Sequence, residues 1–149
     1  KHSRQITFNT FARSSYSGHI DTASKSADVL RKEFVDNLLQ SDYGLEVRGD
    51  PNTSTRLFEI LALGRIPVIL DTERNFPFDD KLDYASFALV VDFRELPRLG
   101  EHIAAFHRSL TPGEFRLMQL RARDAYRNYF RVDALTRPLI EEVKKRVHL

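Results

Sequence analysis

The sequence predicts an α/β domain in which a Rossmann-like parallel sheet is flanked by helices. Three observations lead to this fold class. Residues 66–70 (IPVIL) and 87–91 (FALVV) are continuous apolar runs, typical of strands buried on both faces, as in a parallel sheet. Segments with helical periodicity alternate with such strands, which favours a parallel sheet built in a Rossmann-like half-unit pattern. The chain has 149 residues, of which 42% are hydrophobic, and this suffices for one domain with a buried core.

In the amino-terminal part we expect a loop-rich lead-in over residues 1–25, with a short strand at residues 5–9 (QITFN). Ser, Thr and Gly are frequent in the rest of this segment and favour loops. A helix is predicted over residues 26–40, because apolar residues recur there at helical spacing. Its apolar face consists of Ala27, Leu30, Phe34 and Leu38.

A strand, a turn, a helix and a second strand are predicted next. Residues 43–47 (YGLEV) form the first strand, and residues 48–52 (RGDPN) give the clearest turn signal in the chain. The helix starts at residue 53 or 54 and ends at residue 63, because Gly64 is a typical carboxyl-terminal stop. Pro67 lies near the start of the second strand, where a missing N–H donor is tolerated.

After the second strand we expect a rigid turn at residues 76–78 (FPF) and a short helical turn at residues 79–84. The strand at residues 87–91 follows, and then a helix over residues 96–110.

The remaining chain is predicted to be helical. Thr111, Pro112 and Glu114 form a capping box with proline at the first helical position. The helix that they open has an apolar face of Phe115, Met118, Ala122, Ala125, Tyr126 and Tyr129. Residues 131–149 hold the terminal helix, which starts at residue 133 or 134 and ends at residue 148.

Charge and composition exclude several classes of protein. Residues 1–93 carry a net charge of −3 and residues 94–149 one of +5. No nucleic-acid motif accompanies this basic part, so we expect solvated arginine faces on helices and no nucleic-acid partner. No apolar run approaches the about 20 residues of a membrane span, and no signal peptide is visible. The absence of Cys excludes a disulfide scaffold and a Cys nucleophile.

The residues around the turn at 48–52 combine groups that bind phosphate. A turn after a parallel strand lies at the carboxyl edge of the sheet, and the helix start after it offers free N–H groups. Ser54 and Thr55 add hydroxyls, while Arg48 and Arg56 add cationic donors. Glu59 can accept hydrogen bonds from vicinal hydroxyls, as acidic residues do for ribose. These residues indicate a site for a diphosphate and a ribose.

A purely structural interpretation of the same residues is equally open. Ser54 can serve as a helix N-cap, and Arg56 with Glu59 as an exposed ion pair. Arg48 can form a salt bridge within the loop. The ordinary nucleotide motifs GxGxxG and Walker A are absent.

Several motifs occur in a specific order. They are RGD at residues 48–50, Ser54, RLFE at 56–59, GRIPVI at 64–69, RKEFVDN at 31–37, SDY at 41–43, FPF at 76–78 and LDY at 82–84. With these motifs the chain resembles the carboxyl-terminal, nucleotide-sugar-binding part of the exostosin-type glycosyltransferases over roughly residues 31–120.

The resemblance implies one half of a glycosyltransferase-B fold, with residues 1–149 as a single donor-binding domain and the acceptor domain missing. It implies no cofactor and no metal, because arginines and the helix dipole would neutralise the diphosphate of a UDP-sugar. The donor-site residues that it implies are Arg48, Gly49, Asp50, Asn52, Ser54, Thr55, Arg56 and Glu59.

In this assignment Arg48 and Arg56 bind the diphosphate, Ser54 hydrogen-bonds it and Glu59 holds the ribose. A hexosyl or glycuronosyl group would pass with inversion to a glycan or another hydroxyl acceptor, as in polysaccharide biosynthesis. The catalytic base stays unknown and would lie on the N-terminal acceptor domain.

The chain also departs from the family pattern. Pro51 stands where glycine is common, and Glu46 and Leu63 occupy places where cysteine is often found. Without Cys we expect a cytoplasmic protein, a Golgi-lumenal parent being the alternative. The length, together with Lys1 in place of Met, leads us to expect a fragment of a longer protein.

Two groups of acidic residues suggest roles other than donor binding. Asp71 and Glu73 follow a predicted strand and could hold a divalent cation, although one acidic pair is a weak signal. Asp79, Asp80 and Asp83 are better explained as a helix start on a solvated surface. Two other functions remain open: a non-catalytic binding domain of the same fold and, less favoured, a basic nucleic-acid-binding module.

Overall fold

The computed structural model describes residues 6–10, 26–49 and 54–147. Within these residues it contains one parallel sheet with the strand order β1-β2-β3. The strands are β1 (Tyr43–Glu46), β2 (Ile66–Asp71) and β3 (Leu89–Asp92). Leu45 lies beside Val68 in the register, and Val68 lies beside Leu89. The α/β fold class and the parallel sheet predicted from the sequence are confirmed.

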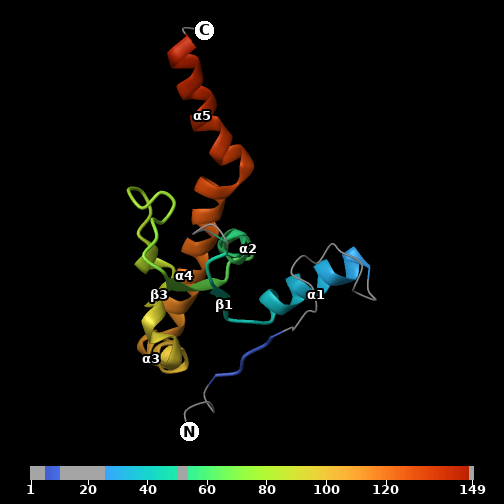
Figure 1. Cartoon of the computed structure of the whole chain (residues 1–149), viewed down its shortest axis with the longest axis vertical. Coiled ribbons are helices and arrows are strands. Elements are labelled where there is room, and N and C mark those ends of the chain that lie inside the picture. The colour runs from blue at the N-terminus through green and yellow to red at the C-terminus, as the bar shows by residue number, and fades with distance from the viewer. Residues whose placement is uncertain (1–5, 11–25, 50–53, 148–149) are drawn as a thin grey trace.

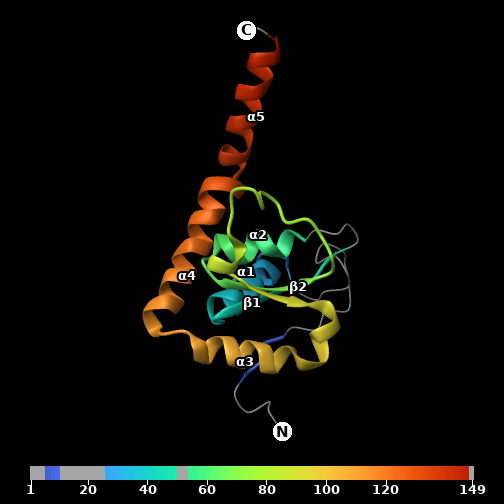
Figure 2. The ribbon, with the colours of Figure 1, turned by 90° about the vertical axis from the view of Figure 1, so that its left-hand side faces the viewer.

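The central strand β2 is buried on both faces, as its continuous apolar sequence predicts. On one face Ile69 packs in a cluster with residues of α2 (Thr55–Ala62), α4 (Pro112–Ala125) and the π-helical segment η4 (Tyr126–Phe130). On the other face Val68 and Leu70 pack against α3 (Leu99–Ser109). Figure 2 shows α2 and α3 on opposite sides of the sheet. Two apolar layers therefore enclose β2.

A close approach of β1 to α2 depends on Gly44. A Cβ atom at this position would lie 2.5 Å from Cγ1 of Ile60, and Ile60 itself is fully buried. Real Cβ atoms do not come so close to another carbon, because the overlap is strongly repulsive. Glycine therefore sets the spacing between the strand and the helix that flank the predicted turn.

Two helices, and the start of a third, follow the predicted boundaries closely. α1 spans Ala27–Leu39, with Ser26 as its N-cap, and stands to one side of the sheet (Figure 1). Gly64 ends α2 with a positive φ of 62°. Both halves of the capping box formed by Thr111 and Glu114 are present at the start of α4. α5 (Val132–Val147) follows η4 and extends away from the sheet in both ribbon views.

The helix predicted over residues 96–110 is divided. A 3-10 helix, η3 (Phe93–Arg98), comes first, and α3 starts only at Leu99. Pro97 lies inside η3 and has no N–H to donate, so an α-helical turn is unfavourable there. Asp92 caps η3 by accepting the backbone N–H of Arg94 at 2.8 Å.

The strand predicted at residues 5–9 is wrong for the part that the structure describes, since residues 6–9 form no strand. Only Ile6 and Phe8 are apolar there, and Phe8 stays 56% exposed. The segment is held by other contacts. Ile6 packs against the apolar cluster that Val68 and Leu70 form with α3. Asn37 donates its side-chain N–H to the carbonyl of Asn9 at 3.1 Å. Two apolar side chains bury too little surface to fix a strand.

The short helical turn expected at residues 79–84 is present in part, because residues 77–81 form turns in which the backbone N–H groups of Lys81 and Leu82 donate to the carbonyl of Phe78 at 2.9 and 2.8 Å. The 3-10 helix η2 (Tyr84–Ser86), capped by Asp83, follows them. None of the helices in the described ranges combines the length and the apolar character needed to cross a membrane.

Candidate functional site

The predicted site lies at the carboxyl end of β1, where the chain passes into α2. Arg48 is exposed and Gly49 half-buried just after the strand. Asp50 and Asn52 lie outside the described residues. The chain is described again from Ser54, one residue before the start of α2. The structure thus places Arg48, Gly49 and the start of α2 at one edge of the sheet.

Ser54 is the N-cap of α2. Its backbone is extended, with φ −141° and ψ 134°, and its hydroxyl accepts the N–H of Arg56 at 3.2 Å. This bond satisfies one of the N–H groups that a helix start leaves without a partner. Thr55 is exposed in the first turn, and the turn contains no acidic residue that would cancel the positive end of the dipole.

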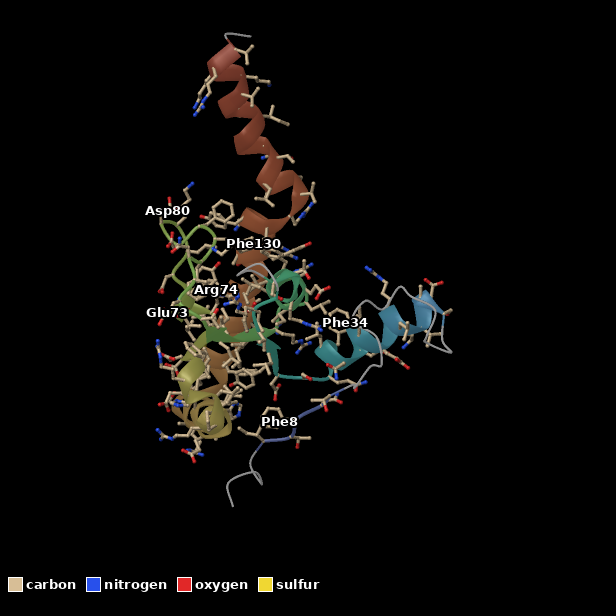
Figure 3. All side chains as sticks on the ribbon, in the orientation of Figure 1. Phe8, Phe34, Glu73, Arg74, Asp80 and Phe130 are labelled. Carbon is tan, nitrogen blue, oxygen red and sulfur yellow. The ribbon has the colours of Figure 1, made fainter. Side chains whose placement is uncertain are left out.

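Arg56 is oriented by two neighbours. Its Nη1 lies 3.9 Å from Oε2 of Glu59, and its guanidinium carbon lies 4.3 Å from the ring centroid of Phe34. Phe34, which is labelled in Figure 3, belongs to α1 and lies where α1 approaches α2. An exposed ion pair of this length contributes little stability, but the ring restricts the guanidinium to one side of α2. The structure brings Ser54, Arg56 and Glu59 together.

Glu59 lies in a partly dehydrated environment. Burial raises the pKa of its carboxyl above the usual value, and the positive charges of Arg56 and Arg31 oppose that increase. Arg31 belongs to α1, so this helix contributes charge to the site as well as Phe34. The sequence motifs did not identify either α1 residue as part of the site.

A buried ion pair that the sequence did not predict stands beside the site. Arg74 binds Glu46 with both terminal nitrogens: Nη1 donates to Oε1 at 2.9 Å, and Nη2 donates to Oε2. The side chains are 4% and 0% exposed, respectively. The two residues are 28 positions apart, and no local pattern joins them. The feature of the sequence that could have indicated this pair is Glu46, a glutamate within the otherwise largely apolar strand predicted at residues 43–47.

The turn after β2 presents Arg74 to this partner. Oδ1 of Asp71 accepts the backbone N–H groups of Glu73 and Arg74, at 3.0 and 3.4 Å. Glu73 has a positive φ of 58° and pairs with Arg94. Asp71 and Glu73 are the two residues considered as metal ligands. In the structure Asp71 stabilises the turn and Glu73 forms an ion pair. No group of three acidic, His or Cys side chains that could hold a metal ion occurs in the described ranges.

The FPF and LDY motifs pack together beyond this turn. The rings of Phe76 and Tyr84 are 4.8 Å apart, and the hydroxyl of Tyr84 donates to the carbonyl of Pro77 at 2.9 Å. Phe78 contacts Phe130 of η4 with ring centroids 5.6 Å apart. Figure 3 shows the loop with Arg74 and Asp80 on the side of the molecule from which α5 departs. Aromatic packing thus fixes the connection between β2 and β3.

A hollow of about 1040 Å³ runs along the outer side of β1, between residues 6–10, α1 and α3. Of the predicted donor-site residues that the structure describes, Arg56 lines it. The hydroxyl of Tyr43 bonds Nδ1 of His107 at 2.8 Å within this lining. The hollow therefore opens beside the start of α2 and offers room for a bound molecule.

Comparison with known protein families agrees with this geometry. The family model of the exostosin GT47 domain matches residues 3–106. The match includes the end of β1, the start of α2, the buried strand β2 and the aromatic block around Phe76 and Tyr84. It begins earlier and ends sooner than the resemblance seen in the motifs. Because the match covers more than half of the chain, the chain belongs to the exostosin GT47 family of glycosyltransferases.

Proposed function

We propose that this chain binds the nucleotide diphosphate sugar donor of a glycosyltransferase, and that the donor is a UDP-sugar. The observation that carries the proposal is Arg56, held by Glu59 and Phe34 beside the capped start of α2. A cationic side chain next to a helix N-terminus is suited to bind a diphosphate.

In this proposal the diphosphate lies between Arg48 and the first turn of α2. Both arginines are accessible there, and the first turn carries no competing acid. Guanidinium groups match phosphate oxygens in geometry as well as in charge. They stabilise the negative charge that develops on the leaving UDP, so the residues themselves supply an electrostatic contribution that needs no metal.

Glu59 is assigned to the ribose. Its contact with Arg56 is long at 3.9 Å, so its oxygens can accept hydrogen bonds from a neighbouring ligand. The raised pKa of Glu59 reflects partial burial, and a hydrogen bond in such a place is stronger than in bulk water. Two vicinal hydroxyls can bind the two oxygens of one carboxylate.

The proposed reaction is sugar transfer to a hydroxyl of a glycan or of another acceptor. The acceptor oxygen attacks the anomeric carbon, the bond from that carbon to the diphosphate breaks, and UDP leaves. A base takes the hydroxyl proton, and attack from the face opposite to UDP inverts the anomeric centre. We assign the base and the acceptor to a second domain of a glycosyltransferase-B arrangement, and the sugar to the hexosyl or glycuronosyl class.

Calorimetric titration of the chain with UDP, UMP and uridine tests the donor assignment. The proposal expects saturable UDP binding that is tighter than UMP binding, and uridine binding weaker than both, because the phosphates meet the arginines. Equal affinities for UDP and uridine would show that the diphosphate is not recognised. Absence of UDP binding would remove the donor role altogether.

A further inference from the structure

A second hollow, of about 360 Å³, lies between the end of α2 and the side of α4. Its walls combine the turn after α2 with one face of α4, and the lining residues are Ala62, Leu63, Gly64, Arg65, Arg116, Gln119, Leu120 and Arg123. The two walls pack against each other, since a Cβ atom at Gly64 would lie in ordinary van der Waals contact, 3.6 Å from Cβ of Arg123 and from the carbonyl oxygen of Gln119. The hollow is therefore part of the packed body of the domain.

Three arginines line this hollow, and no Asp or Glu does. Arg65, Arg116 and Arg123 form no ion pair with any residue in the described ranges. Nearby Arg127, outside the hollow, does pair with an acid, Asp124, at 4.0 Å. Three like charges around one small hollow repel each other, so the arrangement favours an anion between them.

The polar groups of the hollow also leave donors available. Nε of Arg65 is buried and has no hydrogen-bond partner. Arg116 donates from Nη1 to Oε1 of the buried Gln119 at a long 3.3 Å, and Arg123 lies over the ring of Tyr126 at 5.6 Å. A buried N–H without an acceptor is unfavourable, and because this Nε is closed off, an acceptor in the hollow would meet the terminal nitrogens of Arg65. A fully solvated arginine face would not bury Nε of Arg65.

We propose that this hollow binds a phosphate dianion, either as inorganic phosphate or as the end of a phosphate monoester. The planar donors of Arg65, Arg116 and Arg123 match a tetrahedral oxyanion, and the volume leaves room for the ester group. Arg65 directly precedes β2, so the hollow lies at the amino edge of the sheet. The eight residues of α2, about 12 Å of helix, separate it from the donor site at the carboxyl edge.

Calorimetric titration with inorganic phosphate, at constant ionic strength maintained with NaCl, measures this binding. A parallel titration with glycerol 3-phosphate shows whether the ester or the free ion is preferred. We expect saturable binding of at least one of the two, and about tenfold weaker binding or more in the double variant Arg65→Gln with Arg123→Gln. Arg116→Gln, which changes an exposed side chain and leaves the core intact, is expected to weaken binding in the same direction.

Two controls decide the outcome. Arg121→Gln and Arg127→Gln remove exposed arginines that do not line the hollow, and both are expected to keep the phosphate affinity within about twofold. Saturating UDP is expected to leave the affinity unchanged, because the two sites lie at opposite edges of the sheet. The proposal is overturned if neither phosphate binds saturably, if Arg116→Gln binds as tightly as the parent chain, or if UDP competes with phosphate.

Discussion

Arg74 and Glu46 join the turn after β2 to the end of β1 through two parallel hydrogen bonds in the interior of the domain. The pair lies directly before the residues that lead to the proposed donor site. Burying two charges removes their hydration, and the attraction between them offsets that loss only when both are present and well aligned. The pair therefore fixes the relative positions of two loops at the carboxyl edge more than it raises stability.

Removal of one partner of this pair tests that interpretation. Arg74→Met leaves the carboxylate of Glu46 buried without its partner and is expected to lower the free energy of unfolding by about 3–5 kcal/mol. The double variant Glu46→Leu with Arg74→Met is expected to lose less than Arg74→Met alone, because no unpaired charge remains. Urea unfolding of the three proteins measures both effects. A loss below about 1 kcal/mol for Arg74→Met would contradict a buried, mutually dependent pair.

Gly44 gives a second stability prediction. Gly44→Ala places a Cβ atom against buried Ile60 and is expected to cost about 1–3 kcal/mol, the usual range for overpacking a tight core. Gly113→Ala is the matched control, because nothing lies within 4 Å of its Cβ position. Alanine is the better helix former, so the control is expected to be neutral or slightly stabilising. Equal losses in both variants, measured by urea unfolding, would remove the special role of Gly44.

Tyr43 gives a prediction in alkaline solution. Burial, helped by the charge of Asp42, raises the pKa of its phenol from 10.0 to about 12. The folded state thus keeps this proton to a higher pH than the unfolded state. The contribution of the neutral phenol to stability is complete below pH 10 and is lost as pH rises through about 12. Absorbance of tyrosinate at alkaline pH follows the titration directly.

The signature of Tyr43 is the difference between the parent chain and the variant, because burial raises the pKa of Tyr84 as well. Tyr43→Phe should remove absorbance that develops near pH 12 and leave the absorbance that develops near pH 10 unchanged. If the variant instead lacks part of the signal near pH 10, burial does not raise the pKa of the Tyr43 phenol.

The fold follows from the sequence where a pattern is continuous and local. The apolar run at residues 66–70 predicts a strand buried on both faces, and β2 occupies that position. The capping box at Thr111 and the stop at Gly64 are also local signals, and both are confirmed. The division at Pro97 was missed because apolar periodicity continues through it, and the strand at residues 5–9 was predicted from too few apolar side chains.

In the candidate site, too, local contacts are predicted from the sequence and contacts between distant elements are not. The sequence predicts the cap at Ser54 and the pair of Arg56 with Glu59, because these residues are neighbours along one helix. It does not predict Phe34 or Arg74, which reach their partners from other elements. Such contacts depend on how α1 and the turn after β2 pack, and no periodicity encodes this. The donor roles of all the predicted residues stay predictions, namely those of Arg48, Gly49, Asp50, Asn52, Ser54, Thr55, Arg56 and Glu59.

Glu59 allows a test of the ribose assignment. Glu59→Gln keeps the size of the side chain but removes one strong acceptor, so it is expected to weaken UDP binding by about 1–3 kcal/mol. The same substitution should weaken binding of 2′-deoxy-UDP less, because one of the two hydroxyl partners is already missing there. Calorimetry with both nucleotides measures the difference. Equal losses for the two would contradict hydrogen bonding of Glu59 to the 2′-hydroxyl.

Calorimetric titration of UDP against Arg56→Ala tests the central assignment most directly, with Arg127→Ala as the control. Both arginines form exposed pairs with an acid three residues away, at 3.9 Å for Arg56 with Glu59 and 4.0 Å for Arg127 with Asp124. If Arg56 binds the diphosphate, its loss weakens UDP binding by about 1–3 kcal/mol, roughly 5- to 150-fold, while Arg127→Ala leaves the affinity unchanged. An unchanged affinity in Arg56→Ala, or an equal loss in both variants, would contradict donor binding at the start of α2.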